Sequence, residues 1–169
     1  MTEIIRVYDA ASEHFPAGTQ YAIPYVDGRY AATPEQVKAI PHVRWNTVLA
    51  GQAVAAKAGV CDFEPGNESL ENPAALRAWA EGRAALDKLA RCYTNFANLA
   101  LAAQRLQGLG NVRWWLATLD GVERSAAELA AMAARYHVTL DPSAIWAQQY
   151  AGGMTAAYDT SILMPGATW

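Results

Sequence analysis

The sequence has little charge and few cysteines, and each shortage argues against a class of protein. Only 17% of the 169 residues are charged and the formal net charge is -3, so no basic excess favours binding to nucleic acid. Two cysteines, Cys61 and Cys92, are too few for a disulfide framework or a cysteine zinc site. The histidines His14, His42 and His137 are scattered without ligand spacing, so we expect no zinc site.

Long apolar runs are also missing. No segment is long enough to span a bilayer, and the N-terminus lacks a charged region followed by a long apolar stretch. We therefore expect no membrane contact, no secretory signal and synthesis in the cytoplasm. Hydrophobic residues make up 53% of the chain, which excludes wholesale disorder and predicts a single domain over residues 1–169.

Short β-rich runs alternate along the chain with longer, alanine-rich helical stretches. This alternation predicts a parallel α/β sheet, either open and doubly wound or closed into a barrel. No glycine-rich phosphate loop follows a strand, and a full (β/α)₈ barrel takes about 250 residues. A barrel of this length is therefore a compressed TIM-like barrel with some crossover helices reduced to loops. The expected strands are 4–8, 21–26, 42–49, 60–64, 92–94, 112–119, 145–150 and 158–163.

The expected helices follow from capping signals and apolar spacing. Thr33 and Ser125 are predicted N-caps, each with Gln or Glu three residues later. The longest helix is expected to begin at Pro73 and to end near Ala90, and a further helix is expected over 97–106. Leu76, Trp79, Leu86 and Leu89 would form the apolar face of the longest helix.

Acidic residues stand at or near the ends of several predicted strands. Because the carboxyl ends of parallel strands open onto one face of a barrel, these acids would converge on one rim. Taken singly, these acids have plainer interpretations: Asp27 and Asp120 precede glycine and are typical turn formers, and Asp9 could cap the turn that follows it. The residues concerned are Asp9, Asp27, Asp62, Glu64, Asp120 and Asp159.

The triplet Asp62-Phe63-Glu64 is the most informative of these sites. Side chains alternate across a strand, so Asp62 and Glu64 share one face while Cys61 and Phe63 share the other. Two carboxyls side by side in a partly buried rim cannot both ionise easily, so one pKa is expected to rise. A protonated acid beside an ionised one is the arrangement that cleaves glycosidic bonds.

The sequence resembles glycoside hydrolase family 25, the muramidase-type lysozymes of bacteria and phages, and most of all its short actinobacterial and phage members. The resemblance extends over nearly the whole chain. It rests on Val7-Tyr8-Asp9, Tyr25-Val26-Asp27-Gly28, Cys61-Asp62-Phe63-Glu64-Pro65-Gly66, Tyr93-Thr94-Asn95, Trp115-Leu116-Ala117-Thr118-Leu119-Asp120-Gly121, Gln149-Tyr150 and Tyr158-Asp159.

The resemblance implies a peptidoglycan hydrolase that cleaves next to N-acetylmuramic acid, such as an endolysin. It implies no metal and no organic cofactor, and any release to the cell wall would follow a phage-type export or lysis route. Glu64 would be the general acid, and Asp62 would stay ionised and assist it. With the substrate's own acetamido group as nucleophile, Asp62 would orient the acetamido N–H. Asp9 and Asp159 would complete the catalytic set by holding the sugar or water. Sugar contacts are expected from residues near the strand ends, with core packing as the alternative for each aromatic side chain. These are Tyr25, Asp27, Tyr93, Trp115, Gln149 and Tyr150.

Two functions from different classes remain open. The intact pair Asp62 and Glu64 favours the glycosidase. The short chain, and the presence of Ser161 where the family has Asn two residues after the last-strand Asp, favour a non-catalytic glycan-binding or phage or bacterial structural domain derived from the same barrel. A hydrolase of another polysaccharide is a third interpretation.

Overall fold

The computed structural model describes residues 4–9, 15–152 and 158–169, in which nine strands form a single sheet. The strand order is β3-β2-β1-β9-β8-β7-β6-β5-β4. The strands are β1 (Arg6–Asp9), β2 (Tyr21–Ala22), β3 (His42–Val43), β4 (Asn46–Thr47), β5 (Val60–Asp62), β6 (Ala90–Asn95), β7 (Val112–Ala117), β8 (Ile145–Ala151) and β9 (Asp159–Leu163).

The sheet is mixed rather than all-parallel. Strand β9 runs antiparallel to both of its neighbours, β1 and β8, whereas every other pairing is parallel. The prediction of a wholly parallel sheet is therefore wrong at β9. Only residues 152–158 separate β8 from β9, and a parallel crossover needs a dozen or more residues.

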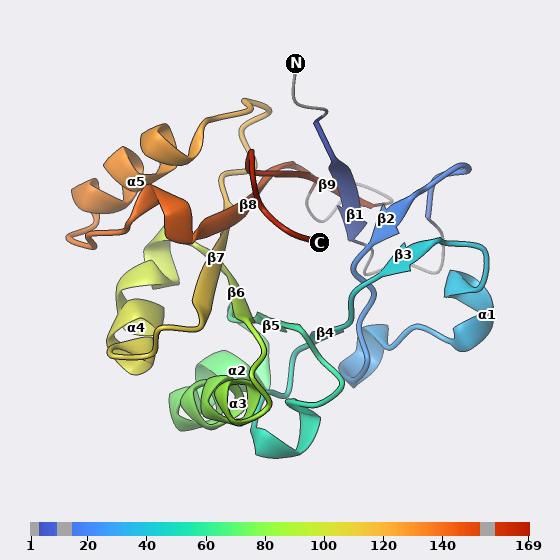
Figure 1. Cartoon of the computed structure of the whole chain (residues 1–169), viewed down its shortest axis with the longest axis horizontal. Helices are drawn as coiled ribbons and strands as arrows, with labels where there is room; N and C mark the ends of the chain where they lie inside the picture. Colours follow the sequence, from blue (N-terminus) through green and yellow to red (C-terminus); the bar gives the residue numbers. More distant parts are fainter. Residues whose placement is uncertain (1–3, 10–14, 153–157) are drawn as a thin grey trace.

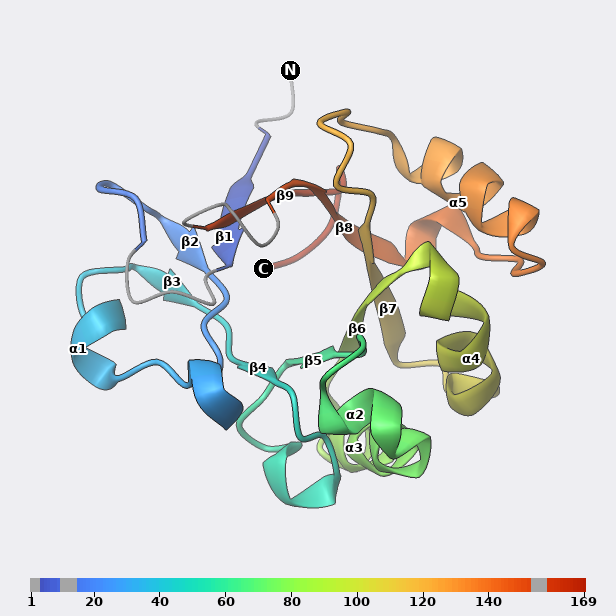
Figure 2. The same ribbon diagram turned by 180° about the vertical axis from the view of Figure 1, so that it is seen from behind.

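The sheet curls into a half-barrel with its helices on the outside (Figures 1 and 2). Its two edge strands, β3 and β4, are separated in sequence only by Arg44 and Trp45. Arg44 N donates to Ala22 O at 3.0 Å on the β2 side, and Val60 N donates to Trp45 O at 3.1 Å on the β5 side. Residues 42–47 therefore contact both arms of the curled sheet.

Five α-helices accompany the sheet in the described part of the chain: α1 (Pro34–Val37), α2 (Glu68–Glu71), α3 (Pro73–Ala85), α4 (Phe96–Leu106) and α5 (Ala126–Arg135). The predicted capping boxes at Thr33 and Ser125 are confirmed. The sequence did not predict α2. The expected end of the longest helix near Ala90 is wrong, because the chain turns at Asp87, whose φ is 55°, and Ala90 begins β6.

Two apolar clusters lie on opposite faces of the sheet. The outer cluster joins the sheet to the helices and includes Cys61, Trp79 and Trp114. The inner cluster contains no residue of α1–α5 and includes Val60, Tyr93 and Trp115. The neighbours Trp114 and Trp115 thus face opposite ways, as the alternation along a strand predicts.

The outer cluster contains both cysteines and the buried apolar side chains of the long helix α3. Cys61 and Cys92 are register partners on β5 and β6, and both are buried free thiols. Leu76 and Trp79 are fully buried on α3, and Trp79 Nε1 donates to Ala58 O at 3.1 Å. Leu86, expected on the same apolar face, is 46% exposed because the helix ends before it.

The same substitution at two positions of the α3 region tests this boundary. We expect Leu76→Ala to destabilise the protein by about 2–5 kcal/mol, because it leaves a cavity in the outer cluster. Leu86→Ala, at an exposed position, is expected to cost less than about 1 kcal/mol. Urea unfolding of both variants measures the difference, and equal losses would contradict the burial described for α3.

Candidate active site

The inner face of the sheet changes from apolar to polar toward one end. On five strand segments an apolar or aromatic residue of the inner cluster is followed two positions later by a polar side chain. Because residues i and i+2 share a face, these polar side chains gather at the carboxyl ends of the parallel strands, above the inner cluster. The pairs are Val7 and Asp9, Ile23 and Tyr25, Val60 and Asp62, Tyr93 and Asn95, and Ala147 and Gln149.

Asp9 and Asp159 lie opposite each other on antiparallel strands. They are register partners of β1 and β9, so their side chains leave the same face of the sheet. Burial, followed by the charges of Asp159, Asp62 and Glu64, raises the pKa of Asp9 well above its usual value. The backbone of Gly152 lies so close to Asp159 that a Cβ atom on residue 152 would overlap the Asp159 carboxylate.

Asp62 ends β5 and is buried among groups that keep it in place. The Tyr25 hydroxyl donates to Asp62 Oδ2 at 2.9 Å. Burial and the charge of Glu64 raise the pKa of Asp62 to about 8, although hydrogen bonds from Tyr25 and Asn67 act in the opposite direction. Burial also raises the pKa of Tyr25 well above its usual value, so this phenol stays protonated and remains a donor.

Glu64 is the more accessible carboxyl of the pair. It is half-buried, and Asn95 Nδ2 donates to its Oε1 at 3.1 Å. Burial raises the pKa of Glu64, the hydrogen bond from Asn95 lowers it, and the charge of Asp159 raises it. Asn95, the last residue of β6, is thus the side chain that orients Glu64.

The order of protonation differs from the sequence-based expectation. Asp62 was expected to stay ionised and to push the proton onto Glu64. Burial favours the opposite order in the free protein, because Asp62 is only 5% exposed and Glu64 is half-buried. With a pKa of about 8, Asp62 carries its proton at neutral pH.

Tyr93 lies within electrostatic reach of all four acids. Burial, followed by the charges of Glu64, Asp62, Asp9 and Asp159, raises the pKa of Tyr93 well above its usual value. Its ring packs edge-on against Trp115, with centroids 4.8 Å apart. All four predicted catalytic residues therefore act electrostatically on one buried phenol.

Several polar atoms of this region are buried without a hydrogen-bond partner among the described residues. Asp9 Oδ1, Gln149 Oε1 and Asn46 Nδ2 are of this kind. Buried polar groups are normally paired with protein or with ordered water. Such atoms at one end of the sheet are suited to binding a polar ligand or bridging waters.

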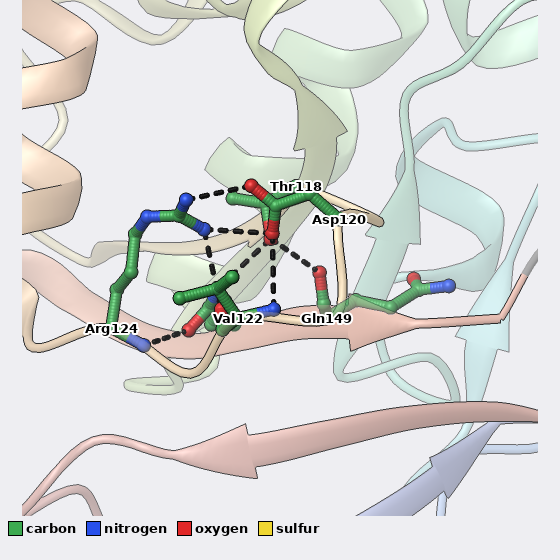
Figure 3. A network of polar contacts seen from close by, with 6 residues as sticks. Thr118, Asp120, Val122, Arg124 and Gln149 are labelled. Carbon is green, nitrogen blue, oxygen red and sulfur yellow. Dashed lines mark hydrogen bonds and ion pairs between the residues drawn. The ribbon is translucent and has the colours of Figure 1, made fainter.

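Asp120 does not join the acids. It lies past the end of β7, is exposed, and forms an ion pair with Arg124 in which Arg124 Nη2 and Asp120 Oδ2 are 2.6 Å apart (Figure 3). The hydrogen bond from Arg124 is the main cause that lowers the pKa of Asp120 to about 2. The expectation that this strand-end acid reaches the rim is wrong, because the Asp120 carboxylate instead organises the turn that leads to α5.

The predicted sugar-binding residues fall in different environments. Tyr25 and Tyr93 lie with the acids but are almost fully buried. Asp27 accepts hydrogen bonds from the Thr47 hydroxyl and, at 2.9 Å, from Val48 N. Trp115 is completely buried, with Nε1 donating to Ser161 Oγ at 3.0 Å.

The other two predicted binding residues are neighbours on β8 that face opposite ways. Gln149 is buried at the acid end of the inner face, two residues after Ala147 of the inner cluster. Tyr150 is half-buried and packs against the outer cluster.

Three asparagines belong to the site that sequence reasoning did not single out: Asn46, Asn67 and Asn95. Asn95 had a detectable signal, since it directly follows the predicted strand 92–94, next to the strand of Asp62 and Glu64. Asn46 and Asn67 had none, because their positions depend on how β4 and the loop after β5 are placed.

No group of three or more His, Cys, Asp or Glu residues in the described ranges is arranged to hold a metal ion. His14 lies outside the described residues. Within residues 4–9, 15–152 and 158–169, no helix has the length and apolar character needed to cross a membrane.

In comparisons with known proteins, the chain matches no family model, no curated protein and no solved structure.

The raised pKa of Asp62 predicts a pH-dependent stability. Between about pH 4 and pH 8 the unfolded chain has lost this proton while the folded protein retains it. Stability from this group is therefore complete below about pH 4 and declines as the pH rises toward 8, by up to about 1.4 kcal/mol per pH unit. Asp62→Asn stays neutral, so urea unfolding is expected to show a gain over the wild type that grows from pH 5 to pH 7.

Asp120→Asn is the matched control for this experiment. The pKa of Asp120 is about 2, so this carboxyl is ionised in both folded and unfolded states above pH 5. Its removal is expected to leave the pH slope unchanged. An Asp62→Asn curve that runs parallel to the wild-type curve would contradict a proton held on Asp62.

Proposed function

We propose that the protein is a glycosidase that cleaves peptidoglycan next to N-acetylmuramic acid. The observation that carries the proposal is the pair Asp62 and Glu64, which leave one face of the sheet with raised pKa values and unequal exposure. Glycosidic cleavage needs a carboxyl that holds its proton near working pH and is within reach of the leaving oxygen. Glu64 meets this need best, because it is the more accessible of the two.

The fold proposed for this activity is a compressed TIM-like barrel. The hydrogen bonds of residues 42–47 to both β2 and β5 support this view, as does the outer position of α3, α4 and α5. Strand β9 would take the place of a parallel strand that a full barrel reaches through a helix. The acids would then stand at the carboxyl ends of the strands, where barrel enzymes carry their active sites.

In the proposed mechanism, Glu64 protonates the glycosidic oxygen as the bond to the anomeric carbon breaks. Asn95, which donates to Glu64 Oε1, would leave Oε2 to carry the proton toward the substrate. Asp62 is held by Tyr25 and would accept a hydrogen bond from the acetamido N–H of the sugar, whose carbonyl oxygen attacks the anomeric carbon. Water then opens this intermediate, with Glu64 taking back the proton.

Positive charge that develops at the anomeric carbon requires a nearby anion. The charge of Asp159 raises the pKa values of Asp9, Asp62 and Glu64, so Asp159 is the carboxylate proposed for this role. Asp9, its register partner, would hold the sugar or a water molecule with its buried Oδ1.

The second candidate is a non-catalytic glycan-binding domain built on the same sheet. The burial of Asp9, Asp62, Tyr93 and Trp115 weighs against catalysis by these four side chains, because they offer little surface to a polymer. The half-buried Glu64 and Asp159 favour the enzyme, since each retains an exposed portion.

Digestion of insoluble peptidoglycan distinguishes the two candidates. The purified protein is incubated with cell walls from several bacteria, and soluble products are read by mass spectrometry. We expect fragments that end in reducing muramic acid, formed faster at mildly acid pH than at neutral pH, because acid protonates Glu64. Glu64→Gln is expected to lower the rate by about a hundredfold or more, since it removes the proton donor.

Glu68→Gln is the matched control, because this exposed residue of α2 loses the same charge. It is expected to retain full activity. A folded wild-type protein that releases no product from any wall, yet sediments with the glycan, would contradict the enzyme and favour the binding domain. Equal activity in the Glu64→Gln variant would remove Glu64 from the mechanism.

A further inference from the structure

A second polar region lies at the opposite end of the sheet from the acids. Asp62 and Asn95 are the last residues of β5 and β6, and Gly59 and Leu89 come directly before the first residues of these strands. Gly59 and Leu89 both line a pocket of about 480 Å³. The indole of Trp169 forms another part of its wall. In Figure 1 the C-terminal segment, which ends at Trp169, crosses the inside of the curled sheet.

The pocket is lined by five cationic side chains and, among the described residues, by no Asp or Glu side chain. Arg83 and Arg91 are 5% and 3% exposed, Arg44 is half-buried, and Lys57 and Lys88 are exposed. None of the five takes part in the ion pairs found in the described part of the chain. A buried charge without a counter-charge is costly, so this arrangement favours an anion.

The arginines differ in how well their donors are satisfied. Arg83 is held by backbone carbonyls, with Nε donating to Leu89 O at 3.0 Å and Nη1 donating to Ala55 O at 2.9 Å. Arg91 Nε and Arg44 Nε are buried and have no hydrogen-bond partner among the described residues. Burial, followed by repulsion from other arginines, lowers the pKa of Arg91 to about 9, so it is still charged at neutral pH.

Aromatic rings hold two of these guanidinium groups in place. The Arg44 guanidinium lies 5.3 Å from the ring centroid of Trp169, and that of Arg91 lies 4.7 Å from the ring centroid of Trp146. Stacking on a ring fixes a guanidinium while leaving its edge free to donate hydrogen bonds. The pocket is therefore organised without a ligand.

We propose that this pocket binds a small molecule that carries a phosphate or diphosphate group. Arg91 and Arg44 would donate hydrogen bonds to its oxygens, and Lys57 and Lys88 would neutralise further charge at the pocket mouth. Paired donors on arginine match phosphate oxygens, and five cations suit a group with more than one negative charge. The proposal is independent of the acids and of the glycosidase activity.

Calorimetric titration with inorganic pyrophosphate, at constant ionic strength, tests the proposal. We expect saturable binding with a dissociation constant below about 1 mM, weaker binding of inorganic phosphate, and weaker binding of citrate. Fluorescence of the tryptophans is expected to change with the same affinity, because Trp169 and Trp146 contact the arginines.

The double variant Lys57→Gln with Lys88→Gln replaces exposed side chains and is expected to fold. It is expected to bind pyrophosphate at least tenfold more weakly. Arg135→Gln, an exposed position at the end of α5, is the matched charge control and is expected to bind like the wild type. Glu64→Gln is also expected to bind like the wild type, which separates this site from the acid end.

Absence of saturable pyrophosphate binding to the wild type would overturn the proposal. So would an unchanged affinity in the lysine double variant, since binding would then lie elsewhere. Preference for citrate over pyrophosphate would overturn the assignment to phosphate chemistry.

Discussion

The low dielectric of the sheet interior is the constraint on which the rest of the structure depends. Strand alternation places Val60, Tyr93 and Trp115 on the inner face, where no helix covers them and they pack on one another. The same alternation places the acids directly above these apolar residues. Carboxyls next to the inner cluster are poorly solvated, so burial is the largest cause of the raised pKa values of Asp9, Asp62 and Glu64.

This constraint also explains how charge is distributed in the molecule. The acids gather at one end of the sheet and the cations Arg44, Arg83 and Arg91 at the other, with the inner cluster between them. The apolar interior keeps the two groups apart, so neither neutralises the other. A ligand that donates hydrogen bonds at the acid end, or an anion at the arginine end, would therefore offset the cost of burying these groups.

Much of the fold was predictable because its signals are local. The capping boxes at Thr33 and Ser125 and the opposite orientations of Trp114 and Trp115 follow from spacing alone. The direction of β9 was not predictable in this way. It depends on a connection too short for a crossover, and strand patterns carry no sign of direction.

The convergence of the four acids was predictable from their positions in the sequence, but the extent of their burial was not. Asp9, Asp62, Glu64 and Asp159 stand at strand ends, and the structure brings them into one electrostatic group around Tyr93. Their burial was not visible in the sequence, and so the proton was assigned to Glu64 rather than to Asp62. The position of Asp120 was not predicted either, because its strand-end pattern does not show that its carboxylate pairs with Arg124, four residues later.

The most direct measurement is an NMR titration of the side-chain carboxyl carbons of Asp62 and Glu64 in the free protein, assigned with Asp62→Asn and Glu64→Gln. If burial above the inner cluster sets the pKa values of the acids, Glu64 ionises first, at a pKa above its usual value, and Asp62 follows near pH 8. Asp62→Asn would leave the Glu64 transition in place. Ionisation of both carboxyls near pH 4 would contradict the central claim, because the interior would then impose no cost on their charge.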